Sequence, residues 1–350
     1  MRGYNLLVGA RRLPVLTRKG AIRLACLFAV IGLLTLGAWS CMIRMPGKSF
    51  QGALPPLSAE EQALAASLRR DVGELAGRIG IRNSMAHPML EDAADYMQSR
   101  LGPSVKRQTF EAGGKKFHNL VLEIPGSSEI VVVGAHYDSV KGCPGANDNG
   151  TGSAALLALA PLFAKAAPAR TLRFVAFPNE EPPHFRTMEM GSRQYAKGCK
   201  ERGENVVAML SLETLGWYSD QEGTQEYPAP LSLVYPSKGN FIAFVGNLSS
   251  GGLVRRAIGA FRERARFPSE GAALPGWLPG VGWSDHWSFW EEGYDAIMVT
   301  DTATFRYPHY HLPSDTPDKV DYERCARVVS GLREVIAELT ASGRPSPPGP

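Results

Sequence analysis

Ionisable side chains follow apolar segments at four places in the sequence, and their types are those that bind metal ions. The apolar runs VVVGA, FVAFPN, MLSL and DAIMVT precede, in this order, His136 and Asp138, Glu180 and Glu181, Glu213, and a later HYH segment with His309 and His311. An ionised side chain at the edge of a core is costly unless a partner compensates for its lost hydration. Carboxylates that converge repel one another, and Lys141 is the one cation within these motifs. A divalent metal ion would resolve this repulsion.

The ligand types narrow the choice of metal. Imidazole and carboxylate without thiolate suit zinc in a catalytic site, or a related first-row ion. By the two-residue period of a strand, His136 and Asp138 lie on one face, so His136 can bind metal while Asp138 holds its other ring nitrogen or orients the backbone. The glycines of GANDNGTG let the backbone pass close to an ion and direct Asp148 inward. A single carboxylate there could bridge two ions.

Alternating strands and helices are expected to position these residues. The pattern predicts strands at 117–125, 129–138, 171–179, 205–213, 231–236 and 295–300, and helices at 58–79, 88–101, 150–166, 190–200, 239–264 and 321–341. This order favours an α/β fold, a three-layer αβα sandwich with a mixed, mainly parallel central sheet. Such sheets bind ligands at the carboxyl ends of their strands, where the ionisable residues fall.

Charge is unevenly distributed along the 350 residues. The chain carries 38 Lys and Arg against 34 Asp and Glu, but eight of the cations and none of the acids precede Glu60. The remainder therefore holds 30 basic and 34 acidic residues, a net charge of −4. A body that binds nucleic acid normally has the opposite sign, so no nucleic-acid partner is expected.

Residues 24–43 form an uncharged apolar segment of the length that spans a bilayer as a helix. Six of the eight early cations precede it, so the positive-inside rule leaves the N-terminus cytoplasmic and the rest periplasmic or extracellular. The predicted organisation is a cytoplasmic basic segment 1–23, a transmembrane anchor 24–43, a linker 44–57, a catalytic domain 58–342 and a disordered tail 343–350. A cleaved signal sequence and a lipid-anchor site at Cys41 are the alternatives.

Five cysteines are too few for a disulfide scaffold. Cys26 and Cys41 lie in the predicted anchor. In an oxidising compartment Cys143 and Cys199 could pair, although separate thiols explain them equally well.

Six motifs in order resemble a known family. HYDS, GANDNGTG, NEE, SLETLGWY, WSDHWSFWEEGYDA and HYHLPSDTPDKVDY are similar to those of the co-catalytic zinc exopeptidases of metallopeptidase family 28, over roughly residues 60–340. That family includes bacterial aminopeptidases, and glutaminyl cyclases share its fold. The resemblance implies a zinc-dependent aminopeptidase that binds two Zn²⁺ ions and hydrolyses N-terminal residues of peptide substrates.

The resemblance also implies roles for single residues. Asp148 would bridge the two ions, with His136 and Glu213 completing one, and Glu181 and His311 the other. Glu180 would be the general base, and Asp138 would support the catalytic site through His136. Many relatives have Asp where this chain has Glu213, so this ligand departs from the pattern. LPSDT follows the last histidine as in the family, which favours His311 over His309 as the ligand.

Other readings remain open. A glutaminyl cyclase-like transferase would use one zinc ion with a similar fold, and a non-catalytic ectodomain would keep the fold without the chemistry. Among the aromatic residues, Trp283, Trp287 and Trp290 lie near Asp285 and could form a hydrophobic substrate pocket or ordinary core. No GxSxG motif accompanies Ser139 or Ser192, which disfavours a serine hydrolase.

Overall fold

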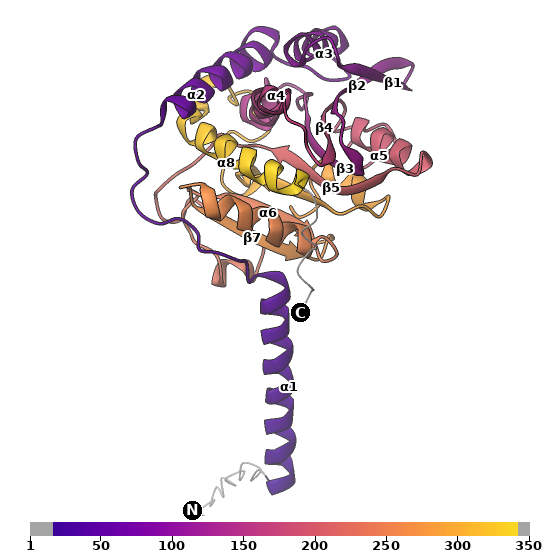
Figure 1. Cartoon of the computed structure of the whole chain (residues 1–350). Helices are drawn as coiled ribbons and strands as arrows, with labels where there is room; N and C mark the ends of the chain where they lie inside the picture. Colours follow the sequence, from indigo (N-terminus) through magenta and orange to yellow (C-terminus); the bar gives the residue numbers. More distant parts are fainter. Residues whose placement is uncertain (1–16, 342–350) are drawn as a thin grey trace, which may run out of the picture. The chain divides into compact units, whose positions relative to one another are not determined.

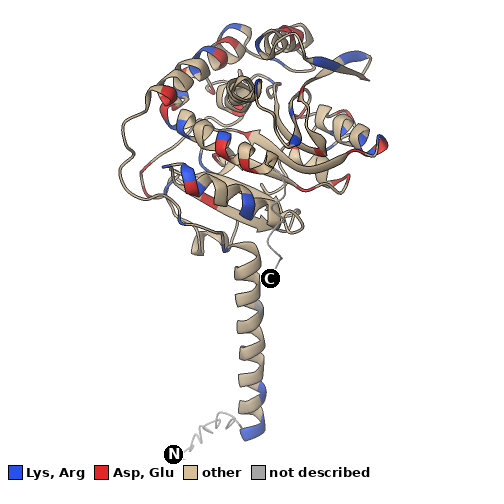
Figure 2. Ribbon diagram, in the orientation of Figure 1, with Lys and Arg blue, Asp and Glu red and all other residues tan. Residues whose placement is uncertain are grey.

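The computed structural model describes residues 17–341 and divides the chain into two compact units, one up to Cys41 and one from Met42 onward (Figure 1). Most of the predicted cytoplasmic segment and all of the predicted tail thus lie outside the described residues. Helix α1 (Arg18–Met42) belongs to the first unit except for its last residue. It begins earlier than expected because the Thr17 hydroxyl accepts a hydrogen bond from the backbone N–H of Gly20. Its lysine and arginine residues lie toward its N-terminal end (Figure 2). By length and composition α1 could be a membrane span or a signal sequence.

The second unit is built on an eight-stranded mixed sheet in the order β1-β2-β4-β3-β5-β8-β6-β7. The strands are β1 (Lys106–Ala112), β2 (Lys115–Ile124), β3 (Ser127–His136), β4 (Arg170–Phe177), β5 (Asn205–Glu213), β6 (Ile242–Asn247), β7 (Ser269–Leu274) and β8 (Ala296–Thr300). Strands β4, β3, β5 and β8 run parallel to one another, whereas β1, β2 and β6 pair antiparallel with their neighbours β2, β4 and β8. The fold is therefore the mixed α/β architecture expected.

Helices cover both faces of this sheet. They are α2 (Ala59–Val72), α3 (His87–Leu101), α4 (Gly152–Phe163), α5 (Gly191–Glu201), α6 (Gly251–Arg264), α7 (His286–Trp290) and α8 (Tyr322–Thr340). The main core unites apolar side chains of α2, α3, α4, α6 and α8 with one face, and a smaller core unites α5 and α7 with the other. Helix α2 begins at the predicted capping box, in which Ser58 and Glu61 each accept the other's backbone N–H.

The register of the parallel strands brings the predicted site residues to one edge of the sheet. His136 at the end of β3 pairs with Phe177 at the end of β4, and Glu213 at the end of β5 pairs with Thr300 at the end of β8. Because parallel strands end at the same edge, the segments that follow them meet there.

Two sequence expectations were wrong in the segment between β5 and α7. Residues 231–236 form a short 3₁₀ turn (Leu231–Leu233) instead of a strand, because the prolines at 228, 230 and 236 interrupt a β-ladder. Residues 239–264 do not form one helix: FIAFVGN provides β6, and the turn NLSSG separates it from α6. Strands β1 and β7 were not predicted.

The cysteines of the second unit are not paired. Cys143, Cys199 and Cys325 are separate buried thiols, so the possible Cys143–Cys199 bridge is not formed.

Candidate metal centre

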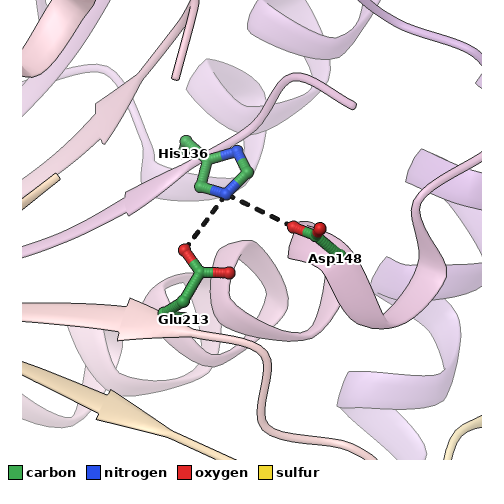
Figure 3. A group of neighbouring side chains, drawn as sticks. All are labelled: His136, Asp148 and Glu213. Carbon is green, nitrogen blue, oxygen red and sulfur yellow. Dashed lines mark ion pairs between the residues drawn. The ribbon is translucent and has the colours of Figure 1, made fainter. Parts of the chain in front are cut away.

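Three side chains from different segments meet at the carboxyl end of the sheet (Figure 3). His136 is the last residue of β3, Glu213 is the last residue of β5, and Asp148 lies in the loop before α4. The Nε2 atom of His136 is 3.2 Å from Glu213 Oε2 and 3.5 Å from Asp148 Oδ1. All three side chains are buried, so their ionisable atoms face one another in place of water.

A second group of side chains shares Asp148 with the first. His311 Nε2 is 3.0 Å from the other carboxylate oxygen of Asp148 and 3.3 Å from Glu181 Oε1. The two groups thus use opposite oxygens of a single carboxylate. This is the arrangement that a bridging ligand between two cations requires.

Asp315 holds the loop that carries Asp148. The backbone N–H groups of Asn147 and Asp148 donate to the two carboxylate oxygens of Asp315, at 2.9 and 3.1 Å. A glycine is required at position 145, because φ is +62° and a Cβ there would lie 2.3 Å from the backbone oxygen of Asp148. The sequence GANDNG therefore fixes the direction of the Asp148 side chain.

Asp138 holds the pair of glutamates that follows β4. Its two oxygens accept the backbone N–H groups of Glu180 and Glu181, both at 3.1 Å, while Oδ1 also lies 3.4 Å from His136 Nδ1. Asp138 therefore both faces the second ring nitrogen of His136 and orients the backbone. Glu180 lies beside the first group, with its Oε2 4.0 Å from His136 Nε2.

The donor set fits metal ions. His136 Nδ1, His136 Nε2 and Glu181 Oε1 are buried atoms without a hydrogen-bond partner among residues 17–341. Buried polar atoms are normally paired, so atoms left unpaired next to other ligands mark a place for a further group. The three carboxylates and two imidazoles of the two groups, without thiolate, suit zinc or a related first-row ion.

The electrostatics of the metal-free site show the same requirement for positive charge. Burial disfavours a charged His136, but Glu213, Asp138 and Asp148 outweigh burial and hold the pKa of His136 well above its ordinary value. Burial is likewise outweighed at His311, where Asp148 and Glu181 raise the pKa to about 10. Protonated imidazoles thus compensate for the carboxylates when no metal ion does.

Two hollows adjoin the ligands. The first, of about 650 Å³, is lined by Asp148, Glu180, Glu181, Pro182, Phe185, Glu213, Trp283, Tyr310 and His311. The second, of about 800 Å³, is mainly apolar and extends away from the ligands between β6, β7 and the segment 225–235. Glu213, Trp283 and Tyr310 line both hollows, so the apolar hollow begins at the ligand groups.

Comparison with known proteins identifies the family. Residues 119–336 match the model of Peptidase family M28. The chain belongs to peptidase family M28. The uncharacterized protein YfbL of Escherichia coli strain K12 is 35% identical over 293 residues, covering 80% of this chain and 89% of that protein.

Two solved structures share the M28 fold. The LapA aminopeptidase of Legionella pneumophila aligns with a TM-score of 0.60 at 19% identity, covering 83% of this chain and 78% of that one. A glutaminyl cyclase of Fimbriiglobus ruber aligns with a TM-score of 0.57 at 22% identity, covering 83% of this chain and 98% of that one. These matches confirm the resemblance and the fold expected from the sequence.

Within this M28 domain, the other candidates from the sequence lie apart from the ligand groups. His309 Nδ1 contacts the Ser314 hydroxyl at 2.9 Å, whereas His311 Nε2 lies 3.0 Å from Asp148. Asp285 is buried and belongs to neither ligand group. Trp283 lines both hollows, whereas Trp290 packs in the core and donates to the backbone oxygen of Ala296. Ser192 Oγ contacts Ser288 Oγ, and Ser139 Oγ accepts from the backbone N–H of Arg82.

Sequence reasoning missed three residues of the candidate site. The ring of Tyr310 stacks on the imidazole of His311 with centroids 3.9 Å apart. Asp315 holds the Asp148 loop, and Asp301, which directly follows β8, accepts from the side chain of Asn147 at 3.0 Å. The signal for Asp301 was present, because it is an acid at the end of an apolar strand. Tyr310 and Asp315 were hidden inside the motif that supplied His311.

Proposed function

We propose that this M28 protein is a zinc-dependent aminopeptidase that removes N-terminal residues from peptides. The observation that carries the proposal is that one buried carboxylate, Asp148, joins two ligand groups beside Glu180 and at the mouth of an apolar hollow. His136, Asp148 and Glu213 would hold one zinc ion, and Asp148, Glu181 and His311 the other. Glu213 is longer than the aspartate common in relatives, and its 3.2 Å approach to His136 supports its use as a ligand.

Glu180 has the environment of a group that exchanges protons. Bound zinc ions supply acidification of a water molecule and polarisation of the scissile carbonyl. Burial raises the pKa of Glu180 well above its ordinary value; Glu181 and Glu213 add to the rise, and His136 opposes it. A carboxylate with a raised pKa can take a proton from the attacking water and deliver it to the leaving amine.

The hollows support a substrate with an apolar N-terminal residue. The apolar hollow continues from Trp283 and Tyr310 into a space lined by Phe241, Leu274 and Met298. An apolar side chain in this space would place the first peptide bond next to the ligand groups. The free amine of the substrate would lie among carboxylates, which favour a cation.

We propose that α1 remains attached as a single membrane span, with the catalytic domain on the periplasmic or extracellular side. The apolar window of α1 and the cations that precede residue 24 support this orientation. Retention of the N-terminal sequence in the mature membrane-bound chain would support the anchor, and cleavage after α1 would identify a signal sequence.

A glutaminyl cyclase activity is the second candidate, because the chain covers 98% of the Fimbriiglobus ruber enzyme. To distinguish the two activities, the purified protein is assayed with aminoacyl amides and with peptides that begin with glutamine, before and after chelation. The number of zinc ions per chain is measured on the same samples. Hydrolysis of amides of apolar residues with two ions bound supports the aminopeptidase. Cyclisation of N-terminal glutamine with one ion bound supports the alternative. A folded protein that binds no metal contradicts both.

A further inference from the structure

Two large apolar side chains of the second unit are almost fully exposed. Leu233 is 83% and Trp277 is 80% exposed, and Val234 next to Leu233 is also exposed. We call Leu233, Val234 and Trp277 the apolar platform. None of the three lines either hollow next to the metal centre. Exposed apolar side chains that gather on one surface are a common sign of a partner.

The two segments of the platform are anchored on one underlying cluster. Ala272 and Leu274 of β7 and Val281 form its buried part. Leu231, Tyr235 and Leu278 pack against this cluster, and they flank the platform residues in the sequence. Leu233 and Trp277 therefore project from neighbouring segments that share a support.

The same cluster receives the start of the second unit. Met42 and Ile43, the first two residues of that unit, pack against it as well. The next residues follow β7: Met45 lies against Gly271, and the Ser49 hydroxyl accepts from the backbone N–H of Ser269 at 2.9 Å. The beginning of the segment predicted as a linker, 44–57, thus packs along β7. No free chain separates the apolar stretch that ends at Met42 from this cluster.

The packing of Met42 and Ile43 on this cluster places the platform close to the end of α1. If α1 crosses a bilayer, the cluster at Met42 and Ile43 lies at the bilayer surface, because one residue spans less than about 4 Å. Tryptophan favours the interface between lipid tails and head groups, and leucine favours the tails beneath. Exposed Arg44 and Lys48 follow directly, and cations at this depth attract anionic head groups.

We propose that the apolar platform inserts into the outer interface of the membrane that α1 spans, with phospholipid as its partner. Leu233 and Val234 lie within the segment 227–235 that walls the apolar hollow, so lipid contact would hold this wall at the membrane surface. The proposal depends on α1 remaining attached as a span, and it is independent of the peptidase activity.

The test uses the full chain in vesicles of phosphatidylethanolamine and phosphatidylglycerol. Cys26 and Cys41, both exposed, are replaced by serine, whereas the three buried cysteines stay. Single variants Leu233→Cys and Trp277→Cys then carry a polarity-sensitive fluorophore. Both positions are highly exposed, so the substitutions leave the core intact. We expect a blue-shifted emission that is quenched by nitroxides on the lipid acyl chains.

Met85→Cys is the matched control. Met85 is an exposed apolar residue that precedes α3. This helix packs on β2, which adjoins the edge strand β1 on the opposite side of the sheet from β7. Its fluorophore should stay in water and escape the lipid quencher. The proposal would be overturned if the labels at 233 and 277 were as exposed to water as the label at 85. It would also be overturned if these labels were shielded from water but not quenched by lipid, a result that would indicate a protein partner or a second copy. Loss of α1 from the mature chain is the third result that would overturn it.

Discussion

At the scale of single residues, two adjacent glutamates have different environments. Glu181 lies 3.3 Å from His311, and burial followed by Asp148 raises its pKa to about 7 in the metal-free chain. Glu180 belongs to neither ligand group, and its pKa is raised well above the ordinary value. The first is suited to a ligand that a cation would hold ionised, and the second to a group that keeps and releases a proton.

Replacing Glu180 by glutamine tests this division. We expect Glu180→Gln to keep its metal content and to lose turnover by about 10²–10⁴-fold, the usual contribution of a general base. Metal analysis and rates on an aminoacyl amide measure the two effects. Glu189→Gln is the control, because Glu189 pairs with His184 outside both hollows. A near-normal rate in Glu180→Gln would remove its role as the base.

The two histidines make metal binding depend on pH. The pKa of His311 is raised to about 10 and that of His136 is also raised, so both imidazoles are protonated at neutral pH without metal. Metal must displace these protons, so its affinity should increase as pH rises from 6 to 9. Titration calorimetry in buffers of different ionisation enthalpy measures the released protons. Binding that releases none would be inconsistent with these shifts.

The same shifts have the opposite effect on the metal-free fold. Because the folded pKa of these histidines exceeds the unfolded value of about 6.5, their protonation stabilises the fold fully below that pH. This contribution is lost as pH rises through about 10 at His311. Chelated protein should therefore lose stability across this range, and added zinc should restore it.

At the scale of elements, the site depends on carboxylates that hold backbone groups. Asp138 joins the end of β3 to the segment after β4, and Asp315 fixes the loop before α4. Each accepts two N–H groups, one per oxygen, which a single amide oxygen cannot reproduce with the same geometry. Metal affinity should thus depend on residues that would not touch the ions.

Asp315→Asn tests this dependence. We expect metal affinity to fall by about 10–100-fold, as is usual when a group that orients a ligand is removed. Competition with a zinc chelator measures it. Asp318→Asn is a suitable control, because Asp318 is exposed and its carboxylate bonds to its sequence neighbours Thr316 and Lys319. Equal affinities in the two variants would show that the Asp148 loop is held by other contacts.

Strand ends were predictable from the sequence because apolar runs and the ligands behind them are contiguous. His136 and Glu213 end strands, and Glu180 and Glu181 follow one, so sequence position determined their place. The prediction of a strand at 231–236 failed because prolines outweigh the β propensity of its apolar residues. The prediction of a helix at 239–264 failed because its first part pairs with β8, which lies 49 residues beyond Asn247. Pairing over such separations has no local signal.

At the scale of the whole molecule, the metal centre joins segments from residue 136 to residue 311. The candidate ligands come from five segments and can be bound together only in the folded chain, so we expect metal binding to stabilise the entire second unit. The order of these segments could be predicted from the motifs. The packing of residues 42–49 along β7 could not be predicted, because the sequence of this segment resembles that of a linker.

Removal of metal should therefore lower the melting temperature. At a metal concentration of 100 times Kd, the stabilisation is about 2.7 kcal/mol. For a unit of this size, with an unfolding entropy of about 0.6 kcal/mol/K, it corresponds to roughly 4 °C. Calorimetry of the zinc-loaded and chelated protein measures the difference. The Asp148→Asn variant should melt at the same temperature with and without chelator. If the melting temperature of the wild-type protein did not change on chelation, the ions would have no structural role.

We infer that carboxylates gather at one edge of the sheet because cations bind among them. Anomalous diffraction at the zinc edge tests this inference most directly. Crystals grown with zinc should show two peaks. One would contact His136, Asp148 and Glu213, and the other Asp148, Glu181 and His311. An anomalous map without a peak at either position, with Asp148 turned away from both histidines, would contradict the account.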